Sequence, residues 1–387
     1  MQKLRKKTAP SRQASYLKHN EVKLIQGGRA YFELLEQMID EAKESIHLQT
    51  YIFDEDTTGS AVGEALIRAA ERGVKVYMLV DGYGSQQLSA AFIKRFKDAG
   101  IFFRKFQPMF KSRRFYLGRR LHHKVVVVDS LRSLVGGLNI SDRYNDMPDA
   151  PAWLDWALYA EGEVAPALED VCKSRLRLRR NKVMILNKVA SVTRECFVGV
   201  RVNDWLRRKR QIYKTYLRMF RDSSSYLIIM SAYFLPGRKF RKKIAEAAAR
   251  GVKVKVVLTG NADVYLIKYA ERYIYRWMFR NGIEVYEYQK SVLHGKIAVC
   301  DSRSMTVGSF NVNNLSAHAS IELNLEVDDP AFALHVQQRL EHIIENDCIQ
   351  ITEETFNRKA NLLVRAARRA AYEVFRFLFF LSTRQAG

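Results

Sequence analysis

Two segments of the sequence carry the same polar side chains at the same spacing. Residues 122–139 read HHKVVVVDSLRSLVGGLN, and residues 294–311 read HGKIAVCDSRSMTVGSFN. Both follow the pattern H-x-K-x4-D-x6-G-[GS]-x-N with no change of spacing. The apolar runs VVVV and IAVC inside them are typical of short buried strands. Because residues two apart on a strand share a face, each segment presents an imidazole beside an ammonium group.

These residue types suit a phosphodiester. A neutral imidazole is a nucleophile and proton carrier near neutral pH, and a lysine ammonium neutralises phosphate oxygens. One set is half a site, but with two sets one histidine attacks phosphorus while the other protonates the leaving oxygen and later deprotonates the acceptor. Because the lysines supply positive charge, we expect no metal and no cofactor. The two sets are His122, Lys124 and Asn139, and His294, Lys296 and Asn311.

Catalytic histidines need a carboxylate to orient the second ring nitrogen. Asp155, in WLDWALY, and Glu322, in SIELNLEV, follow the two motifs and lie in strand-like runs, where a carboxylate is otherwise out of place. The alternative is a surface position on a half-exposed strand. Asp129 and Asp301 complete the motifs and are counted with the catalytic residues. However, the odd offset of Asp129 from Lys124 favours a role in fixing a turn or a helix end.

The elements that must position these residues also repeat. Residues 66–80 and 244–258 each read as an Ala-rich helix that ends at a glycine and feeds a β-branched strand. Apolar strands precede them at 45–53 and 226–234, helices precede those at 30–43 and 206–221, and third strands follow at 102–106 and 283–288. The alternation predicts an α/β fold of two similar halves, each a sheet covered by helices.

The repeat sets the expected domain organisation. We expect a basic N-terminal tail over 1–20, a first half over 21–165 and a second half over 216–350. A basic linker with connecting helices is expected over 166–215 and a C-terminal helix over 351–387.

Composition limits the class of protein. The 387 residues carry 64 Lys and Arg against 41 Asp and Glu, a formal charge of +23, and 48% are hydrophobic, which excludes a disordered chain. The four cysteines are scattered with no CxxC pair, so a disulfide framework or a Cys-based zinc site is not expected, and a reducing compartment fits. The excess charge indicates nucleic acid or an anionic lipid surface as a partner.

The C-terminal segment bears on that choice. An aromatic run over 375–381 surrounds Arg376, and three arginines lie upstream among alanines and leucines. This pattern is typical of a helix that lies in the plane of an anionic bilayer. The alternative is a helix docked on the protein's own core. No apolar run of 18 residues predicts a spanning helix, and the N-terminus does not read as a secretory signal.

Paired HxKxxxxD motifs in a duplicated α/β chain resemble the phospholipase D superfamily, and the resemblance covers roughly residues 20–350. Within it, DGYGS at 81–85, GGLNI at 136–140, SAYFLPG at 231–237 and LHGK at 293–296 look most like bacterial cardiolipin synthases of the shorter type without N-terminal transmembrane helices. The resemblance implies two mixed-sheet halves about a pseudo-twofold axis, with one shared site at their seam.

The resemblance also implies transphosphatidylation, in which a phosphatidyl group moves through a phosphohistidine to the hydroxyl of phosphatidylglycerol. The N-terminal histidine, His122, would be the nucleophile and His294 the acid and base, although the near-symmetric sequence allows the reverse. The resemblance leaves two pairings of the carboxylates open, within a half and across the seam. The protein would be peripheral on the cytoplasmic face of a bacterial inner membrane, with phospholipid substrates and no nucleic acid.

Three other functions compete. A nuclease of the same superfamily would use the same chemistry and its basic clusters would hold a phosphate backbone, but it needs no aromatic-basic helix. A phospholipase would differ only in using water as the acceptor. A non-catalytic membrane or scaffold protein would be expected to have lost a motif residue. Residues 110–121 and 265–276, which mix aromatic and basic side chains, are candidates for gripping lipid headgroups.

Overall fold

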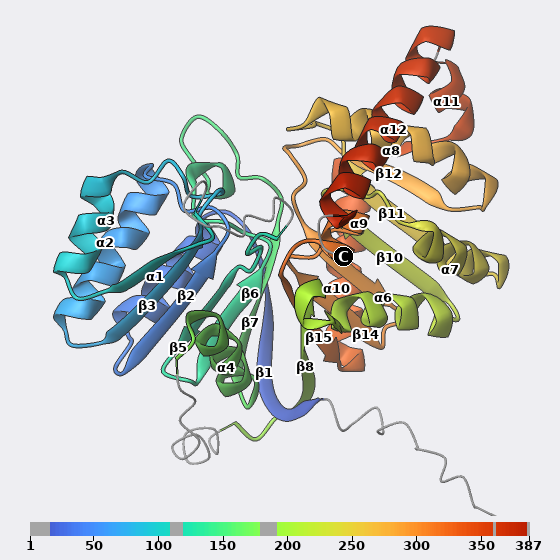
Figure 1. Ribbon diagram of the computed structural model, residues 1–387. Coiled ribbons are helices and arrows are strands. Elements are labelled where there is room, and N and C mark those ends of the chain that lie inside the picture. Colours follow the sequence, from blue (N-terminus) through green and yellow to red (C-terminus); the bar gives the residue numbers. More distant parts are fainter. Residues whose placement is uncertain (1–15, 109–118, 179–191, 359–360, 385–387) are drawn as a thin grey trace, which may run out of the picture.

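The computed structural model describes residues 16–108, 119–178, 192–358 and 361–384 (Figure 1). Its first half alternates strands and helices before a run of antiparallel strands. In order the elements are β1 (Leu17–Gln26), α1 (Arg29–Asp40), β2 (Ser45–Thr50), α2 (Thr57–Glu71), β3 (Lys75–Asp81), α3 (Ala90–Asp98), β4 (Phe102–Phe106), β5 (Val125–Val128), β6 (Arg132–Gly136), η2 (Asp142–Tyr144), β7 (Trp156–Gly162) and α4 (Val164–Leu176).

The second half repeats this order and adds three elements at its end. Its elements are β8 (Glu195–Asp204), η3 (Trp205–Arg207), β9 (Lys209–Arg210), α6 (Gln211–Asp222), β10 (Tyr226–Ser231), α7 (Arg238–Ala249), β11 (Lys253–Thr259), α8 (Tyr265–Arg280), β12 (Glu284–Tyr288), β13 (Lys296–Cys300), β14 (Ser304–Gly308), α9 (Asn314–His318), β15 (Glu322–Asp328) and α10 (Pro330–Asp347), followed by β16 (Cys348–Ile351), α11 (Glu353–Arg358) and α12 (Leu362–Arg384).

The sheet order shows the duplication directly. From one edge the first half runs β4-β3-β2-β5-β6-β7-β1, and the second half mirrors it as β12-β11-β10-β13-β14-β15-β8, with β16 beside β12. In each half the first three strands are parallel and the rest antiparallel, so both sheets are mixed. The halves join where β1 pairs with β8, at Leu17 and Val198. The predicted α/β fold of two similar halves is confirmed.

Three apolar cores hold these layers. One lies between the first sheet and α1, α2 and α3, and a second between the other sheet and α6, α7 and α8. The third contains buried residues of both halves together with residues of α4 and α10. In it the indole Nε1 of Trp156, from the first half, lies 3.2 Å from the sulfur of Met230, from the second. The seam between the halves is therefore a packed core.

The helix-to-strand connections follow the predicted local rule. Gly73 and Gly251 end the two Ala-rich helices with φ near +90°, at 89° and 90°. A residue with a Cβ is strained at such a positive φ, whereas glycine is not. The chain can therefore reverse at once into β3 and β11, the central parallel strands of each half.

The predicted boundaries need two corrections. β1 begins at Leu17, inside the segment predicted as a tail, and β8 lies inside the predicted linker. β8 was missed because polar residues interrupt its apolar pattern. Their burial is offset by partners: the Arg201 guanidinium pairs with Glu326 at 2.6 Å. Within the described part of the chain, no helix is long and apolar enough to span a bilayer.

Candidate active site

Both histidine–lysine motifs lie at the seam, where the backbones of the two halves meet. The segment before His122 pairs with the segment before Glu322, and the His122 N–H donates to the Ile321 carbonyl at 2.9 Å. The segment before His294 pairs with the one before Asp155, and the His294 N–H donates to the Leu154 carbonyl at 2.8 Å. These short ladders place each motif beside a carboxylate of the opposite half.

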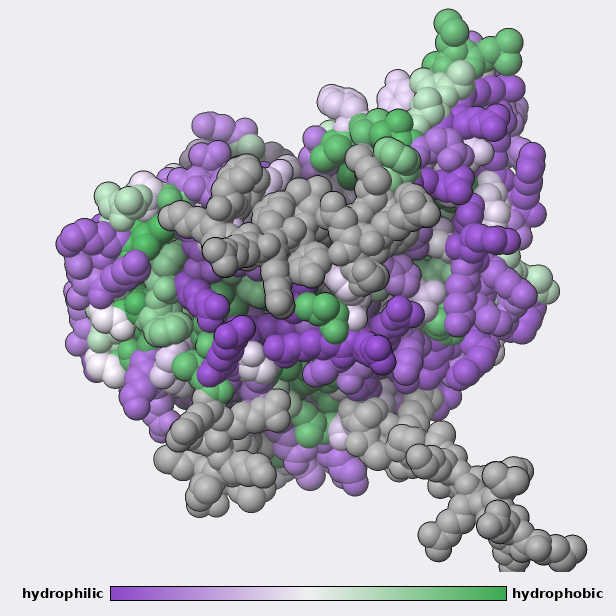
Figure 2. Space-filling model, in the orientation of Figure 1, coloured by the Kyte–Doolittle hydropathy of each residue, from purple (hydrophilic) through white to green (hydrophobic). Residues whose placement is uncertain are grey.

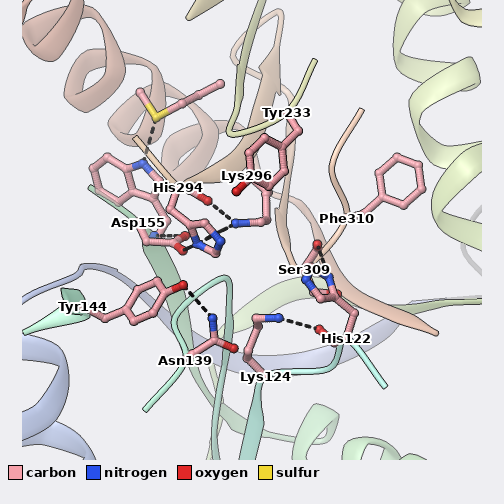
Figure 3. Close-up of polar contacts among 12 residues, drawn as sticks. His122, Lys124, Asn139, Tyr144, Asp155, Tyr233, His294, Lys296, Ser309 and Phe310 are labelled. Atoms are coloured by element: carbon pink, nitrogen blue, oxygen red, sulfur yellow. Dashed lines mark hydrogen bonds and ion pairs between the residues drawn. The ribbon is translucent and has the colours of Figure 1, made fainter. Parts of the chain in front are cut away.

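The side chains complete that crossing. His122 Nδ1 lies 2.8 Å from Glu322 Oε2. His294 Nδ1 lies 2.6 Å from Asp155 Oδ2, and Figure 3 draws this second contact. Both carboxylates are fully buried. With Nδ1–H donated to a carboxylate, Nε2 keeps the lone pair that attacks phosphorus or takes a proton. The sequence left open whether the carboxylates pair within a half or across the seam, and the structure pairs them across it.

The two lysines bring positive charge into the same buried space. Lys124 Nζ donates to the His122 carbonyl at 3.0 Å, and Lys296 Nζ lies 3.6 Å from Asp155 Oδ2. Burial, followed by the charge of Lys296, lowers the pKa of Lys124 to about 7. Burial likewise lowers the pKa of Lys296, while Asp155 and Glu322 oppose the shift. An entering phosphate anion would stabilise both ammonium groups.

The histidines are held in their neutral form. Burial lowers the pKa of His122, although the Glu322 carboxylate opposes the shift. Burial together with the charge of Lys296 lowers the pKa of His294 to about 3, against the pull of Asp155. Neutral imidazoles suit both predicted roles, since a nucleophile and a general base each need a free lone pair.

The structure gives the two motif asparagines different surroundings. Asn139 accepts from the Ile52 N–H at 3.1 Å and donates to the Tyr144 hydroxyl at 2.8 Å. The bond to Tyr144 uses one of the two hydrogens on the Asn139 amide nitrogen. The Oδ1 atom of Asn311 is buried without a hydrogen-bond partner among the described residues. Asn139, through Tyr144, also supports the aromatic wall next to His294.

The motif aspartates lie away from the histidines. The Asp129 carboxylate accepts from three consecutive backbone N–H groups, at residues 43–45, and Asp301 does the same at residues 224–226. Each lies five residues beyond its motif lysine, just past the far end of β5 or β13, which is roughly 16 Å along an extended strand. Their inclusion among the catalytic residues is therefore corrected. Both fix the turn that enters β2 or β10, which is the role favoured for Asp129.

Aromatic rings line the site unequally. The Tyr144 ring lies 5.1 Å from the His294 ring, with Trp153 at 6.0 Å and Tyr233 at 6.5 Å, whereas Tyr51 lies 5.1 Å from His122. Sequence reasoning missed these residues as site residues. The available signal was that Tyr51 and Tyr233 lie at equivalent places near the ends of the repeated strands predicted at 45–53 and 226–234. Tyr144 ends the short helix η2 and Trp153 lies in an irregular segment, and neither position carries such a signal.

An arginine cluster borders the site beside His122. Arg119 and Arg175, from the first half, contact the buried Asp204 carboxylate of the second half at 3.3 and 2.6 Å, and Arg207 lies 3.8 Å from it. The cluster ties the halves together and leaves positive charge near the motif. Most of the predicted headgroup-gripping segment 110–121 lies outside the described residues.

Comparison with known proteins agrees with this geometry. The family model described as "Cardiolipin synthase, PLD-like domain" matches residues 35–149 and 216–344, one stretch in each half. The chain belongs to this family. The chain is 33% identical to cardiolipin synthase B of Escherichia coli K12 over 352 residues, which cover 88% of this chain and 84% of that protein. A cardiolipin synthase of Oceanobacillus iheyensis is 26% identical over 347 residues, covering 89% and 72%.

Solved structures show the same fold at low identity. The crystal structure of phosphatidylserine synthase from Haemophilus influenzae superposes with a TM-score of 0.73 at 14% identity and covers 95% of this chain and 96% of that one. Polyphosphate kinase from Porphyromonas gingivalis superposes with a TM-score of 0.60 at 15% identity, covering 93% and 53%. The predicted relationship to the phospholipase D superfamily is confirmed, and as a family member the chain is a phosphatidyltransferase.

Proposed function

We propose that the protein makes cardiolipin by moving a phosphatidyl group from one phosphatidylglycerol to the hydroxyl of another. The observation that carries the proposal is the crossed pair of histidine–carboxylate contacts at the seam, with both motif lysines buried beside them. The names of the relatives support phosphatidylglycerol or a related phospholipid as the donor.

The reaction divides into two displacements. In the first, the neutral Nε2 of His122 attacks phosphorus, an N–P bond forms, and the P–O bond to glycerol breaks while His294 gives the leaving oxygen a proton. In the second, His294 takes the proton of the acceptor hydroxyl. The oxygen of that hydroxyl bonds to phosphorus, and the N–P bond breaks. Following the family pattern, we assign the attack to His122. Lys124 and Lys296 neutralise the non-bridging oxygens in both steps.

His294 starts neutral in the free site, so the first step requires it to gain a proton. A bound phosphodiester brings negative charge beside both histidines and raises their proton affinity. The buried Asp155 carboxylate, 2.6 Å from Nδ1, stabilises the imidazolium that forms. The same carboxylate holds the ring in one orientation through both steps.

The membrane partner and location extend this proposal. The substrates are anionic lipids, and the formal charge of +23 is complementary to them. We place the protein at the cytoplasmic face of a bacterial inner membrane as a peripheral enzyme. The bacterial origin of the relatives supports this location.

Lipid analysis tests the proposed function. Purified protein is incubated with phosphatidylglycerol vesicles in the presence of a chelator, and the lipids are identified by mass spectrometry. Cardiolipin and free glycerol are the expected products, and neither His122→Ala nor His294→Ala should form them. Phosphatidic acid alone would make water the acceptor and the enzyme a hydrolase. No lipid turnover would contradict the proposal and direct the next assay to cleavage of plasmid and single-stranded DNA.

A further inference from the structure

Helix α12 has a packed face and an exposed face. Ala371 is buried against α8, and Tyr372 and Phe375 pack in the same apolar cluster. The opposite face carries a continuous stripe of exposed small and apolar residues. They are Leu362, Leu363, Ala366, Ala367, Ala370, Val374 and Phe377. Leu362 and Leu363 are 81% and 79% exposed, far more than a helix docked only on its own core requires.

Helix α8 extends the exposed surface. Tyr265, Tyr269 and Tyr273 recur every four residues on one face, with Leu266 beside them, and Tyr265 is 75% exposed. The Tyr273 ring stacks on Tyr372 of α12 with centroids 4.7 Å apart. This stack joins the exposed tyrosine face of α8 to helix α12. We call the surface formed by Tyr265, Leu266, Tyr269, Tyr273, Leu362, Leu363, Val374 and Phe377 the α8–α12 platform.

Arginines border the platform. Along α12, Arg365, Arg369 and Arg376 follow one edge of the apolar stripe, and Arg280 is exposed on α8. Glu373 is the only acidic residue of α12. Figure 2 shows hydrophobic surface over α8 and α12 at the upper edge of the view, next to hydrophilic surface. Exposed tyrosines beside a basic border are typical of a helix lying at the headgroup level of an anionic bilayer.

The platform is tied to the active site through the segment 233–235. The Tyr233 hydroxyl, beside His294, donates to Asp263 at 2.5 Å just before α8 begins. Glu271 of α8 accepts from the Phe234 N–H at 2.7 Å, and Leu235 packs with residues of α8 and α12. The other end of α12 contacts α9, which follows the second motif (Figure 1). The surface therefore lies on the His294 side of the site.

We propose that the α8–α12 platform docks on an anionic phospholipid bilayer and presents the His294 side of the site to the lipids. The apolar stripe enters the headgroup boundary, the tyrosines lie at its level, and the arginines contact anionic headgroups. This inference rests on the proposed lipid substrate, because an enzyme without one has no use for such a surface.

Vesicle binding tests the platform without depending on turnover. Full-length protein is sedimented with vesicles of equal parts phosphatidylglycerol and phosphatidylcholine, and with phosphatidylcholine alone. The quadruple variant Tyr265→Ser, Leu266→Ser, Leu362→Ser, Leu363→Ser changes only exposed side chains. We expect it to bind the mixed vesicles at least tenfold more weakly. Arg365→Gln and Arg369→Gln should each lower the affinity for the mixed vesicles about fivefold and leave the affinity for neutral vesicles almost unchanged.

The matched control removes exposed apolar side chains elsewhere. Leu334→Ser with Ile349→Ser lies on α10 and β16 and should bind vesicles like the wild type. Turnover of phosphatidylglycerol in detergent micelles should stay within about twofold for every variant. Wild-type binding by the quadruple variant would overturn the inference. So would a lipid-free dimer that the same substitutions dissociate, since a second copy would then occupy the platform. Loss of micellar turnover in the wild type would instead count against the proposed function.

Discussion

Glu322, from the second half, accepts a hydrogen bond from His122 of the first half at 2.8 Å. Asp155 and His294 make the reciprocal contact at 2.6 Å. Neither half therefore contains a complete histidine–carboxylate pair. Formation of the seam is what assembles the catalytic machinery, and this explains why a duplicated chain has one site at its centre.

The crossing makes each carboxylate essential to a histidine that lies far away in the sequence. Glu322→Gln keeps the size of the side chain but removes the negative charge beside His122. That charge stabilises the imidazole ring when it becomes positive on bonding to phosphorus. We expect turnover of phosphatidylglycerol in micelles to fall about 10³- to 10⁴-fold, as for a triad aspartate changed to asparagine. Asp155→Asn should behave alike. The control is Glu161→Gln, on β7 away from the motifs, which should retain full activity. If Glu322→Gln turned over phosphatidylglycerol as fast as the wild type, the Glu322 carboxylate would have no part in the mechanism.

Asp301 should matter for stability and not for chemistry. Its carboxylate accepts backbone N–H bonds from Ser224, Ser225 and Tyr226, and these lower its pKa although burial raises it. Asp301→Asn should cost about 2–3 kcal/mol of unfolding free energy at pH 7. Because the folded-state pKa is depressed, the wild-type advantage is present above the unfolded pKa of about 3.9 and is lost as pH falls through the folded pKa.

Denaturation of wild type and Asp301→Asn at several pH values measures that difference. The folded variant should keep its turnover per molecule in micelles. A fully stable but inactive variant would return Asp301 to the catalytic residues.

Much of this organisation could be predicted because the repeat is visible in residue types. Asp155 and Glu322 were identifiable since a carboxylate in an apolar run must have a partner. Their crossing could not be predicted, because it depends on how the two sheets pack. β8 was hidden because buried Arg201 breaks its apolar pattern, and its buried partner Glu326, on the neighbouring strand β15, explains that arginine. Trp153 lies in an irregular segment, where local sequence does not determine which histidine it faces.

The Lys124 pKa of about 7 predicts a pH effect on anion binding. The ammonium form binds the phosphodiester, and the free enzyme loses that form as pH rises above about 7. The inhibition constant of sulfate, which keeps its charge throughout, should therefore rise up to tenfold per pH unit between pH 7 and 9. Inhibition by sulfate is measured against phosphatidylglycerol in micelles. The Lys124→Met variant should show weak inhibition without this slope, and a flat wild-type profile would contradict the shift.

The cluster around Asp204 should stabilise the seam. The carboxylate is fully buried and contacts Arg119 and Arg175 of the other half. Asp204→Asn leaves these guanidinium groups without a counter-charge and should lower the unfolding free energy by about 3–5 kcal/mol. Arg207→Gln is the control, because that side chain is 47% exposed and lies 3.8 Å away, and it should cost less than about 1 kcal/mol. Urea unfolding measures the free energy of unfolding of both variants. Equal losses in Asp204→Asn and Arg207→Gln would show that burial of the Asp204 carboxylate does not matter for stability.

Position 137 of the first motif is glycine, whereas the equivalent position 309 of the second is serine. Exchanging the two residue types tests what each contributes to its carboxylate. The Ser309 hydroxyl donates to Glu322 Oε2 at 2.5 Å, whereas the equivalent Gly137 faces Asp155 so closely that a Cβ there would lie 2.2 Å from Oδ1. Gly137→Ser should displace Asp155, release the His294 ring and lower turnover at least 100-fold. Ser309→Gly removes only one donor to a carboxylate, which still holds His122, so turnover should fall about three- to tenfold.

Ser309→Thr keeps the hydroxyl and should recover most of the activity that Ser309→Gly loses. A structural role alone would leave the pH profile of kcat/KM unmoved. Loss of the donor instead raises the proton affinity of the Glu322–His122 pair and shifts the acid limb of that profile to higher pH. Tolerance of Gly137→Ser, with Asp155 still bonded to His294, would show that the tight approach of this glycine does not hold the carboxylate in place.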